Sequence, residues 1–240
     1  MKKILITGAS GGIGSSIADK FLKHKYEMIL TSSSDVTMNK LREKYGNNHH
    51  YYRLNFSNPD ENNVILKKIS EEHQDLDVIV NNAGITDDSL ILRMKADQWN
   101  NVIQANLSSN FIIIKALLPN MIKNKLGKII GVSSVVATSG NPGQSNYVAA
   151  KSGMIGLYKS IALEVASRNV NVNIVSPGFI ISPMTDKLND KQKNIILEKI
   201  PMKRFGETSE IADLVYFLSS DDAKYITGQN IHINGGMLMV

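Results

Sequence analysis

Short apolar segments alternate with helical segments along nearly the whole chain, and this alternation constrains the fold more than any other feature. Each apolar segment is rich in Val, Ile and Leu, and the stretch after it carries apolar residues at helical spacing. This order is typical of a parallel sheet covered by helices on both faces. We therefore predict an α/β fold with a doubly wound, mostly parallel, seven-stranded sheet. The expected strands are 3–7, 28–31, 51–54, 76–80, 128–132, 170–175 and 230–233.

The helices between these strands should each bury one face. In the first helix the apolar face is expected to include Leu22. The third helix should begin after an N-cap at Asn58, and Val64 is expected to point inward from it. The longest helix carries apolar residues from Trp99 to Leu118 and is expected to end at Pro119.

No internal repeat, low-complexity tract or linker is present in the sequence, so residues 1–240 are expected to form a single domain. The pattern is irregular from 179 to 206, apart from a helical piece near 190–200. Segments of this kind often act as movable covers, and we expect this one to cover the substrate.

The composition excludes several classes of protein. Of the 240 residues, 42% are hydrophobic and 20% are charged, as in soluble globular proteins, and the absence of cysteine excludes disulfides, thiol nucleophiles and cysteine-zinc sites. No apolar run approaches the ~18 residues of a membrane span and the start does not resemble a signal peptide, so we expect a cytoplasmic protein without a membrane partner. The net charge of +5 is spread along the chain without a basic arm for nucleic acid. His49 and His50 lie in an expected polar turn, and no set of His, Asp and Glu has convincing metal-ligand spacing, so no metal site is predicted.

A glycine-rich loop joins the first expected strand to the first helix. Gly8, Gly12 and Gly14 allow a tight turn and let a dinucleotide pyrophosphate approach the backbone at the helix N-terminus. A glycine cluster can also be a turn and nothing more, but the strand–turn–helix context favours dinucleotide binding.

The end of the second expected strand should indicate which dinucleotide is bound. An acidic residue there would hold the ribose hydroxyls of NAD and repel the phosphate of NADP. The sequence has a threonine and three serines at 31–34, followed by Asp35. The hydroxyls favour NADP, while Asp35 and the lack of a nearby arginine keep NAD open.

The segment 131–151 holds the residues with the clearest chemistry. Tyr147 and Lys151 are four apart on an expected helix and share a face, and Ser134 follows a strand at its carboxyl end, where ligands bind in such sheets. Lys151 is expected to lower the pKa of Tyr147, which would make proton transfer to a carbonyl oxygen feasible, and Ser134 could hydrogen-bond the same oxygen. A Tyr and a Lys at this spacing can also be packing with a snorkelling cation, so the pair alone is weak evidence for ketone reduction.

Several motifs follow one another in a fixed order, namely Gly8-x-x-x-Gly12-x-Gly14, Asn81-Asn82-Ala83-Gly84, Ser134, Tyr147-x-x-x-Lys151 and Pro177-Gly178. With this set the chain resembles the short-chain dehydrogenase/reductase family, which has a Rossmann-type fold. The stretches NNAGITDDSLILRMK, NPGQSNYVAAKSGMIGL and HINGGMLMV are similar to those of the bacterial β-ketoacyl-carrier-protein reductases in that family. The resemblance runs from Lys3 to Val240.

The resemblance implies a role for each matching residue. Tyr147 would protonate the keto oxygen, and Lys151 would lower the pKa of that tyrosine and bind the nicotinamide ribose. Ser134, rather than Ser133, would bind the carbonyl, and Asn106 would bend the long helix and support a water relay to the lysine. The cofactor would contact Gly8, Ser10, Gly11, Gly12, Ile13, Gly14, Ser33, Asn55, Phe56, Asn82 and Ile180, besides Tyr147 and Lys151.

The resemblance also implies partners. An acyl carrier protein would dock on Lys125 and Arg168, and the chain would form a homotetramer through the long helix, the Tyr147 helix and the last strand. Three positions depart from the family pattern. Gly11 stands where relatives that use NADP often carry arginine, and Ile181 and Pro183 replace polar or acidic residues.

On this basis we expect NADPH-dependent reduction of β-ketoacyl-carrier-protein thioesters to (3R)-β-hydroxyacyl thioesters in fatty acid elongation. One alternative is a reductase of another carbonyl, such as acetoacetyl-CoA or a polyketide intermediate. Another is a non-catalytic dinucleotide-binding sensor. Such a sensor would be expected to lose Tyr147, Lys151, Ser134 or Asn106, and all four are present.

Overall fold

The computed structural model describes residues 1–56, 59–181 and 189–240. Within these residues, seven strands form one sheet in the order β3–β2–β1–β4–β5–β6–β7, and every neighbouring pair is parallel. The predicted α/β, doubly wound, Rossmann-type fold is confirmed. The strands are β1 (Lys3–Ile6), β2 (Glu27–Ser32), β3 (His50–Arg53), β4 (Val78–Asn81), β5 (Gly127–Val132), β6 (Val170–Pro177) and β7 (Asn230–Ile233).

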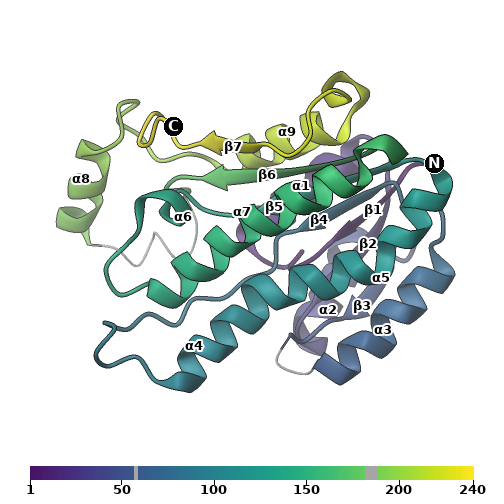
Figure 1. Ribbon diagram of the computed structural model, residues 1–240, viewed down its shortest axis with the longest axis horizontal. Coiled ribbons are helices and arrows are strands. Elements are labelled where there is room, and N and C mark those ends of the chain that lie inside the picture. The colour runs from purple at the N-terminus through teal and green to yellow at the C-terminus, as the bar shows by residue number, and fades with distance from the viewer. Residues whose placement is uncertain (57–58, 182–188) are drawn as a thin grey trace.

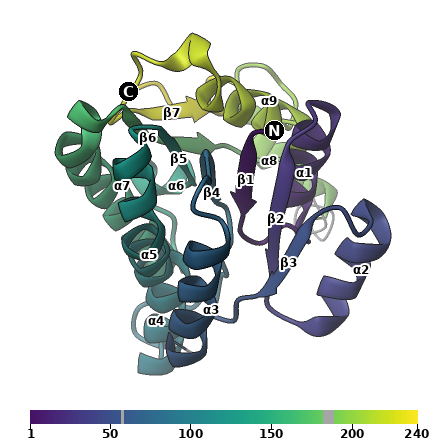
Figure 2. The same ribbon diagram turned by 90° about the vertical axis from the view of Figure 1, so that its right-hand side faces the viewer.

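Helices cover both faces of this sheet, as Figures 1 and 2 show. One face carries α1 (Gly12–Lys23), α2 (Asp35–Tyr45) and α9 (Thr208–Ser219). The other carries α3 (Pro59–Glu72), α5 (Ser109–Asn124) and α7 (Ser145–Val165), with α4 (Ala96–Ile103) running on into α5 through a π-helical turn, Gln104–Ser108. The short helices α6 (Val136–Ser139) and α8 (Asp190–Glu198) lie with α4 toward the carboxyl ends of the strands (Figure 1).

Each central strand is buried on both faces, which explains its continuous apolar sequence. In β1, Ile4 and Ile6 pack under α1 and α9, while Leu5 between them packs on the side of α3 and α5. All three side chains are fully buried. Burial of such a side chain contributes about 1.5–3 kcal/mol, so the sheet is the energetic centre of the molecule.

The direction of winding reverses beside β1, because β1 pairs with β2 on one side and with β4 on the other. The chain builds one half of the sheet outward from β1 and then returns to build the second half from β4. Loops that leave β1 and β4 at their carboxyl ends therefore diverge, and the crevice between them is where open α/β sheets bind ligands.

Two side chains that were predicted to be buried on their helices are exposed. Leu22 is 41% exposed and Val64 is 71% exposed, because the buried stripe of α1 ends at Phe21 and that of α3 runs through Leu66 and Ile69. The expected N-cap of α3 at Asn58 lies outside the described residues.

The prediction that the long helix ends at Pro119 is wrong, because the helix continues to Asn124. A proline in a helix removes one backbone hydrogen bond and costs about 3 kcal/mol. The turn after it places Met121 in the core with no exposed surface. Burial of that side chain offsets much of the cost, so the proline does not end the helix.

Among the described residues one helical stretch, Ala96–Asn124, is long and apolar enough to cross a membrane by length and composition alone. Its mean hydropathy of 1.2 is at the lower limit for such a helix. It packs between α3 and α7, and core helices often meet the same criterion.

Candidate active site

Tyr147, Lys151 and Ser134 lie together at the carboxyl edge of the sheet, as their spacing predicted. Ser134 follows β5, and α7 runs past it with Tyr147 and Lys151 on its inner side. The Lys151 ammonium nitrogen lies 5.7 Å from the centre of the Tyr147 ring and donates a 2.7 Å hydrogen bond to the carbonyl of Val132. The hydroxyl of Ser134 hydrogen-bonds the phenol of Tyr147. The arrangement holds a phenol and a serine hydroxyl where one carbonyl oxygen can reach both.

The prediction that Lys151 lowers the pKa of Tyr147 is wrong for the chain without a bound cofactor. Burial raises the pKa of Tyr147 to about 12, and the hydrogen bond from Ser134 only partly opposes that rise. Burial also lowers the pKa of Lys151 to about 8, because the residue is only 3% exposed. Desolvation therefore dominates both groups, and Tyr147 is a protonated phenol at neutral pH.

Ser133 has a different place from Ser134. It is 4% exposed, its backbone N–H donates to Val175, and its hydroxyl donates to the carbonyl of Lys151 at 3.2 Å. Ser133 thus ties α7 to β5, whereas Ser134 is half-buried at the edge of the site.

Asn106 lies in the π-helical turn, so the long helix departs from α-helical geometry where the asparagine was expected to bend it. Its side chain is fully buried and pairs with the backbone of Ile85, donating to the carbonyl at 2.9 Å and accepting from the N–H at 3.2 Å. A Cβ atom on Gly84 would lie 2.3 Å from Asn106 Oδ1 and 3.6 Å from Lys151 Nζ. Asn106 and Lys151 therefore flank Gly84, which has no room for a side chain.

A cavity of about 550 Å³ opens beside these residues at the point where the winding reverses. The predicted glycine loop forms its floor: Gly8 has a φ of +64°, and a Cβ atom on Gly14 would lie 2.2 Å from the carbonyl oxygen of Gly8. A ligand can approach this backbone because no side chain covers it. Ten predicted cofactor contacts line the cavity, namely Gly8, Ser10, Gly11, Gly12, Ile13, Gly14, Ser33, Asn55, Phe56 and Asn82.

The glycine loop is held by side chains that the sequence did not single out. The Thr7 hydroxyl accepts hydrogen bonds from the N–H groups of Asn82 and Ala83, each at 3.0 Å. The Asn82 amide donates to the carbonyls of Thr7 and Gly8. The ends of β1 and β4 are thus fixed to each other. The residues present fit a dinucleotide, since a bare, rigid backbone at a helix N-terminus suits a pyrophosphate.

An arginine that the sequence did not indicate lies next to Ser32, one of the residues that line the cavity. Parallel pairing places Arg53 of β3 opposite Ser32 of β2, and its guanidinium lies 3.5 Å from the carboxylate of Asp35. The lack of a nearby arginine was therefore a wrong expectation, because the sheet brings together residues 18 apart in the sequence. Ser33 is exposed beside them.

Comparison with known proteins agrees with this geometry. A family model described as enoyl-(acyl carrier protein) reductase matches residues 8–238. The chain is 46% identical to the 3-oxoacyl-(acyl-carrier-protein) reductase of Vibrio cholerae, and the 239 aligned residues cover 100% of this chain and 98% of the relative. It is 47% identical to the enzymes of the same name from Rickettsia conorii and Escherichia coli, with the same coverage. The chain belongs to the short-chain dehydrogenase/reductase family.

In this short-chain dehydrogenase/reductase, the first turn of α7 is anchored by residues that no motif indicated. The fully buried amide of Asn146 donates to the carbonyls of Asp87 and Gln98, at 2.9 and 3.2 Å, and accepts from the N–H of Tyr147 at 2.8 Å. Gln98 in turn donates to the Asp87 carboxylate. This network ties α7 and α4 to the loop after β4 and so positions the tyrosine.

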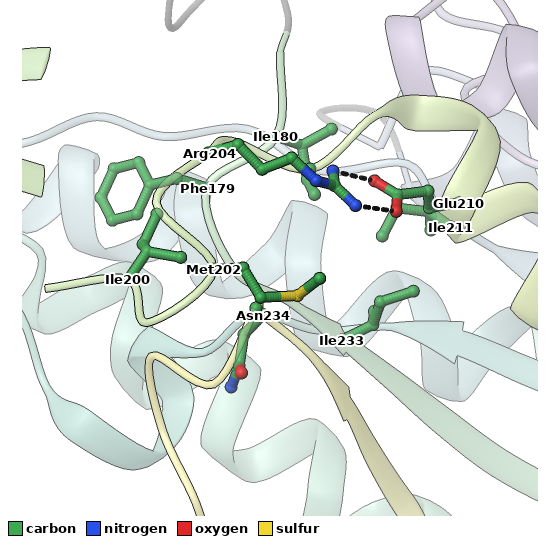
Figure 3. A pocket seen from close by; sticks show the side chains of 11 residues that line it. Phe179, Ile180, Ile200, Met202, Arg204, Glu210, Ile211, Ile233 and Asn234 are labelled. Carbon is green, nitrogen blue, oxygen red and sulfur yellow. Dashed lines mark hydrogen bonds and ion pairs between the residues drawn. The ribbon is translucent and has the colours of Figure 1, made fainter. Parts of the chain in front are cut away.

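Ile180, expected at the nicotinamide end, lines a separate cavity of about 80 Å³ (Figure 3). Ile180 forms an isolated parallel β-bridge with Gly206, and this bridge joins the two ends of the segment predicted to cover the substrate. Arg204 and Glu210 close one side of this cavity with two hydrogen bonds of 2.8 and 2.6 Å, which lower the pKa of Glu210 to about 2. Within 179–206, Pro183 lies outside the described residues.

Lys125 and Arg168 are also close in the family fold, but not near the tyrosine. The Asn169 side chain donates to the carbonyl of Lys125 at 3.0 Å, which joins the two turns that carry these cations. Both turns precede strands, β5 and β6, whereas Ser134 follows β5. The pair therefore lies at the amino edge of the sheet, and Tyr147 lies at the carboxyl edge.

Proposed function

We propose that this protein is an NADPH-dependent reductase that converts β-ketoacyl-(acyl-carrier-protein) thioesters to (3R)-β-hydroxyacyl thioesters in fatty acid elongation. The observation that carries the proposal is a glycine-floored cavity of about 550 Å³ whose lining includes Gly84, next to Lys151 and, through Lys151, to Tyr147. The names of relatives 46–47% identical over their full length support the substrate class.

The protonation states suit reduction. The bound dinucleotide would supply the hydride. Tyr147, held protonated by its raised pKa, donates its proton to the keto oxygen as negative charge develops there. Ser134 hydrogen-bonds the same oxygen, and this contact strengthens as the charge grows. Lys151 lies behind the phenol and supplies positive charge below its pKa of about 8. Asn106 positions the backbone beside Lys151 through Ile85 and Gly84.

NADPH is proposed over NADH because of the groups at the end of β2. The exposed Ser33 hydroxyl and the guanidinium of Arg53 can both bind a ribose phosphate. The carboxylate of Asp35, which would favour NAD, forms an ion pair with the guanidinium of Arg53 at 3.5 Å. Gly11 supplies no side-chain contact, so the preference depends on Ser33 and Arg53.

We also propose that the protein forms a homotetramer in the cytoplasm. Apolar side chains remain exposed on the helices that the family uses for assembly: Phe111 on α5 is 49% exposed and Leu163 on α7 is 86% exposed. A second copy would cover these faces. Sedimentation of the purified protein should give a tetramer, and a monomer at micromolar concentration would contradict this part.

The test is oxidation of NADPH with an acetoacetyl-carrier-protein substrate, by the wild type and by Tyr147→Phe. The variant should lose about 10²–10⁴-fold in kcat, since the proton donor is gone, while its Kd for NADPH stays within about twofold. The control, Tyr225→Phe, changes a fully exposed tyrosine and should leave kcat unchanged.

Other outcomes point to the alternatives. Equal kcat/KM with acetoacetyl-CoA would reduce the proposal to a general β-ketothioester reductase. Dinucleotide binding without turnover of any ketone would favour a non-catalytic sensor and would overturn the enzyme proposal.

A further inference from the structure

Three potential metal ligands meet at the amino edge of the sheet, on the opposite edge from Tyr147. Glu27 begins β2, His50 begins β3, and His73 follows α3. One ligand atom from each residue lies within 4.8 Å of the other two. His50 Nε2 is 2.7 Å from Glu27 Oε1, and the two imidazole rings have centres 4.4 Å apart. The sequence suggested no metal site because these residues are far apart along the chain and His50 was expected in a polar turn.

The sheet creates the cluster. The register of β2 and β3 pairs Ile29 with His50, so Glu27 precedes the paired position by two residues and points to the same face. That face is the one covered by α3. The chain leaves α3 at Glu72, which brings His73 over the same spot.

His73 is a buried polar side chain with an unused atom. It is 3% exposed, and its Nδ1 has no hydrogen-bond partner among the described residues. Its Nε2 lies 2.9 Å from the hydroxyl of Tyr52, which itself donates to Glu72. A buried polar atom left without a partner costs about 1–3 kcal/mol, so a ligand that uses the ring would recover that cost.

The donor set determines which ion fits. Two imidazoles and one carboxylate suit Zn²⁺, whereas Ca²⁺ and Mg²⁺ prefer oxygen ligands throughout. Burial lowers the pKa of His73, which keeps the ring neutral and able to bind a metal. Around an ion with bonds of about 2.0–2.2 Å, tetrahedral ligand atoms lie roughly 3.3 Å apart, so side-chain shifts of about 1 Å would close the site.

The surroundings provide support and access. Tyr52 and Glu72 form the kind of hydrogen-bonded chain that fixes a metal-binding histidine from behind. Lys3, the cation facing Glu27 at 3.7 Å, is itself paired with Asp75 at 2.9 Å, which reduces its repulsion of an ion. The His50 side chain is 42% exposed, which leaves a path from solvent.

We propose that Glu27, His50 and His73 form a binding site for one Zn²⁺ ion, with water as the fourth ligand, that links β2, β3 and the end of α3. The site is structural and independent of the proposed reductase chemistry. Zn²⁺ bound to the folded chain alone would raise its melting temperature by mass action.

The test uses full-length protein without a polyhistidine tag, stripped with a chelator and titrated with zinc chloride by calorimetry. One Zn²⁺ should bind per chain, and Co²⁺ at the same site should give the visible absorption of a tetrahedral complex. His50→Gln and Glu27→Gln should each weaken binding about tenfold or more. The matched control is His24→Gln, which removes an exposed histidine outside the cluster and should leave the Kd within about twofold.

His50 and Glu27 are chosen because they begin strands and are less buried than His73, so their variants should fold even if His73→Gln does not. Far-ultraviolet circular dichroism will verify this. No saturable Zn²⁺ binding by the wild type, or equal affinity in His50→Gln, Glu27→Gln and wild type, would overturn the proposal and leave only a His50–Glu27 hydrogen bond. Reductase activity should be unchanged by zinc or by chelator.

Discussion

Lys151 shows at the scale of one residue how function opposes stability. Its side chain is 3% exposed and no carboxylate pairs with it among the described residues, and burial lowers its pKa from 10.5 to about 8. The shift corresponds to roughly 3 kcal/mol of destabilisation while the amine is charged. Between pH 8 and 10.5 the folded state releases this proton while the unfolded state keeps it. The contribution of Lys151 to the free energy of unfolding therefore rises with pH in that window.

Lys151→Met should abolish reduction and stabilise the fold. The variant loses the hydrogen bond to Val132, which costs about 1–3 kcal/mol, but no longer buries a charge. We expect a melting temperature about 2–4 °C higher than wild type at pH 7, and a smaller gain at pH 9.5. Lys159→Met, on the exposed side of α7, is the control and should change neither property. A lower melting temperature at pH 7 would contradict the argument.

Arg53 carries the second prediction at this scale. Arg53→Ala should raise the Kd for NADPH about tenfold, because one charged contact to the ribose phosphate is removed, and should leave the Kd for NADH unchanged. Fluorescence titration with both cofactors measures the difference. Arg42→Ala, which removes an exposed arginine on the neighbouring α2, should affect neither. Equal losses for NADPH and NADH would show that Arg53 does not read the phosphate.

At the scale of one element, the first turn of α7 matters most, because the sequence did not indicate the Asn146 hydrogen bonds that hold Tyr147 there. Asn146→Ala leaves two carbonyls and the N–H of Tyr147 without partners, so it should lower the free energy of unfolding by about 2–4 kcal/mol. It should also lower kcat, because the phenol is no longer held. Urea unfolding and steady-state kinetics measure the two effects. Asn141→Ala, an exposed loop residue five positions earlier, should cost under about 0.5 kcal/mol.

The elements themselves were predictable, since apolar runs and helical spacing located every strand of the sheet. The predictions that failed concern features that depend on residues close in space but not in sequence. Val64 follows the apolar pattern of its helix but lies outside the stripe that α3 buries, and Pro119 is tolerated because Met121 is buried beyond it. Arg53 reaches Asp35 only through the register of β2 and β3. The raised pKa of Tyr147 depends on burial, which sequence spacing does not report.

At the scale of the whole molecule, the two edges of the sheet hold different sites. The residues proposed to bind cofactor and substrate lie at the carboxyl edge, while Lys125 and Arg168 lie at the amino edge. The pair and the Tyr147 of the same chain lie at opposite ends of β5. Docking there would favour delivery of the acyl group to a neighbouring subunit of the proposed tetramer.

Charge reversal tests this arrangement. Lys125→Glu with Arg168→Glu should raise KM for acetoacetyl-carrier-protein about tenfold, through loss of attraction to an acidic carrier, and leave KM for acetoacetyl-CoA unchanged. Reversal of Lys23 and Lys40, two exposed lysines on the opposite helical layer, is the matched control. An unchanged KM for the carrier-bound substrate in the Lys125/Arg168 variant would show that the carrier does not dock on these two residues.

The position of β1 in the middle of the sheet also affects how the chain folds during its synthesis. Synthesis proceeds from the N-terminus, yet β1 needs β4, some 75 residues later, before both of its edges are paired. Until then a strand of fully buried residues such as Ile4, Leu5 and Ile6 has one edge open to other chains. Parallel pairing over such sequence distances is slow, because loop closure precedes any gain from contact. We therefore expect the nascent chain to depend on assistance against aggregation until β4 emerges, although the finished sheet buries Ile4, Leu5 and Ile6.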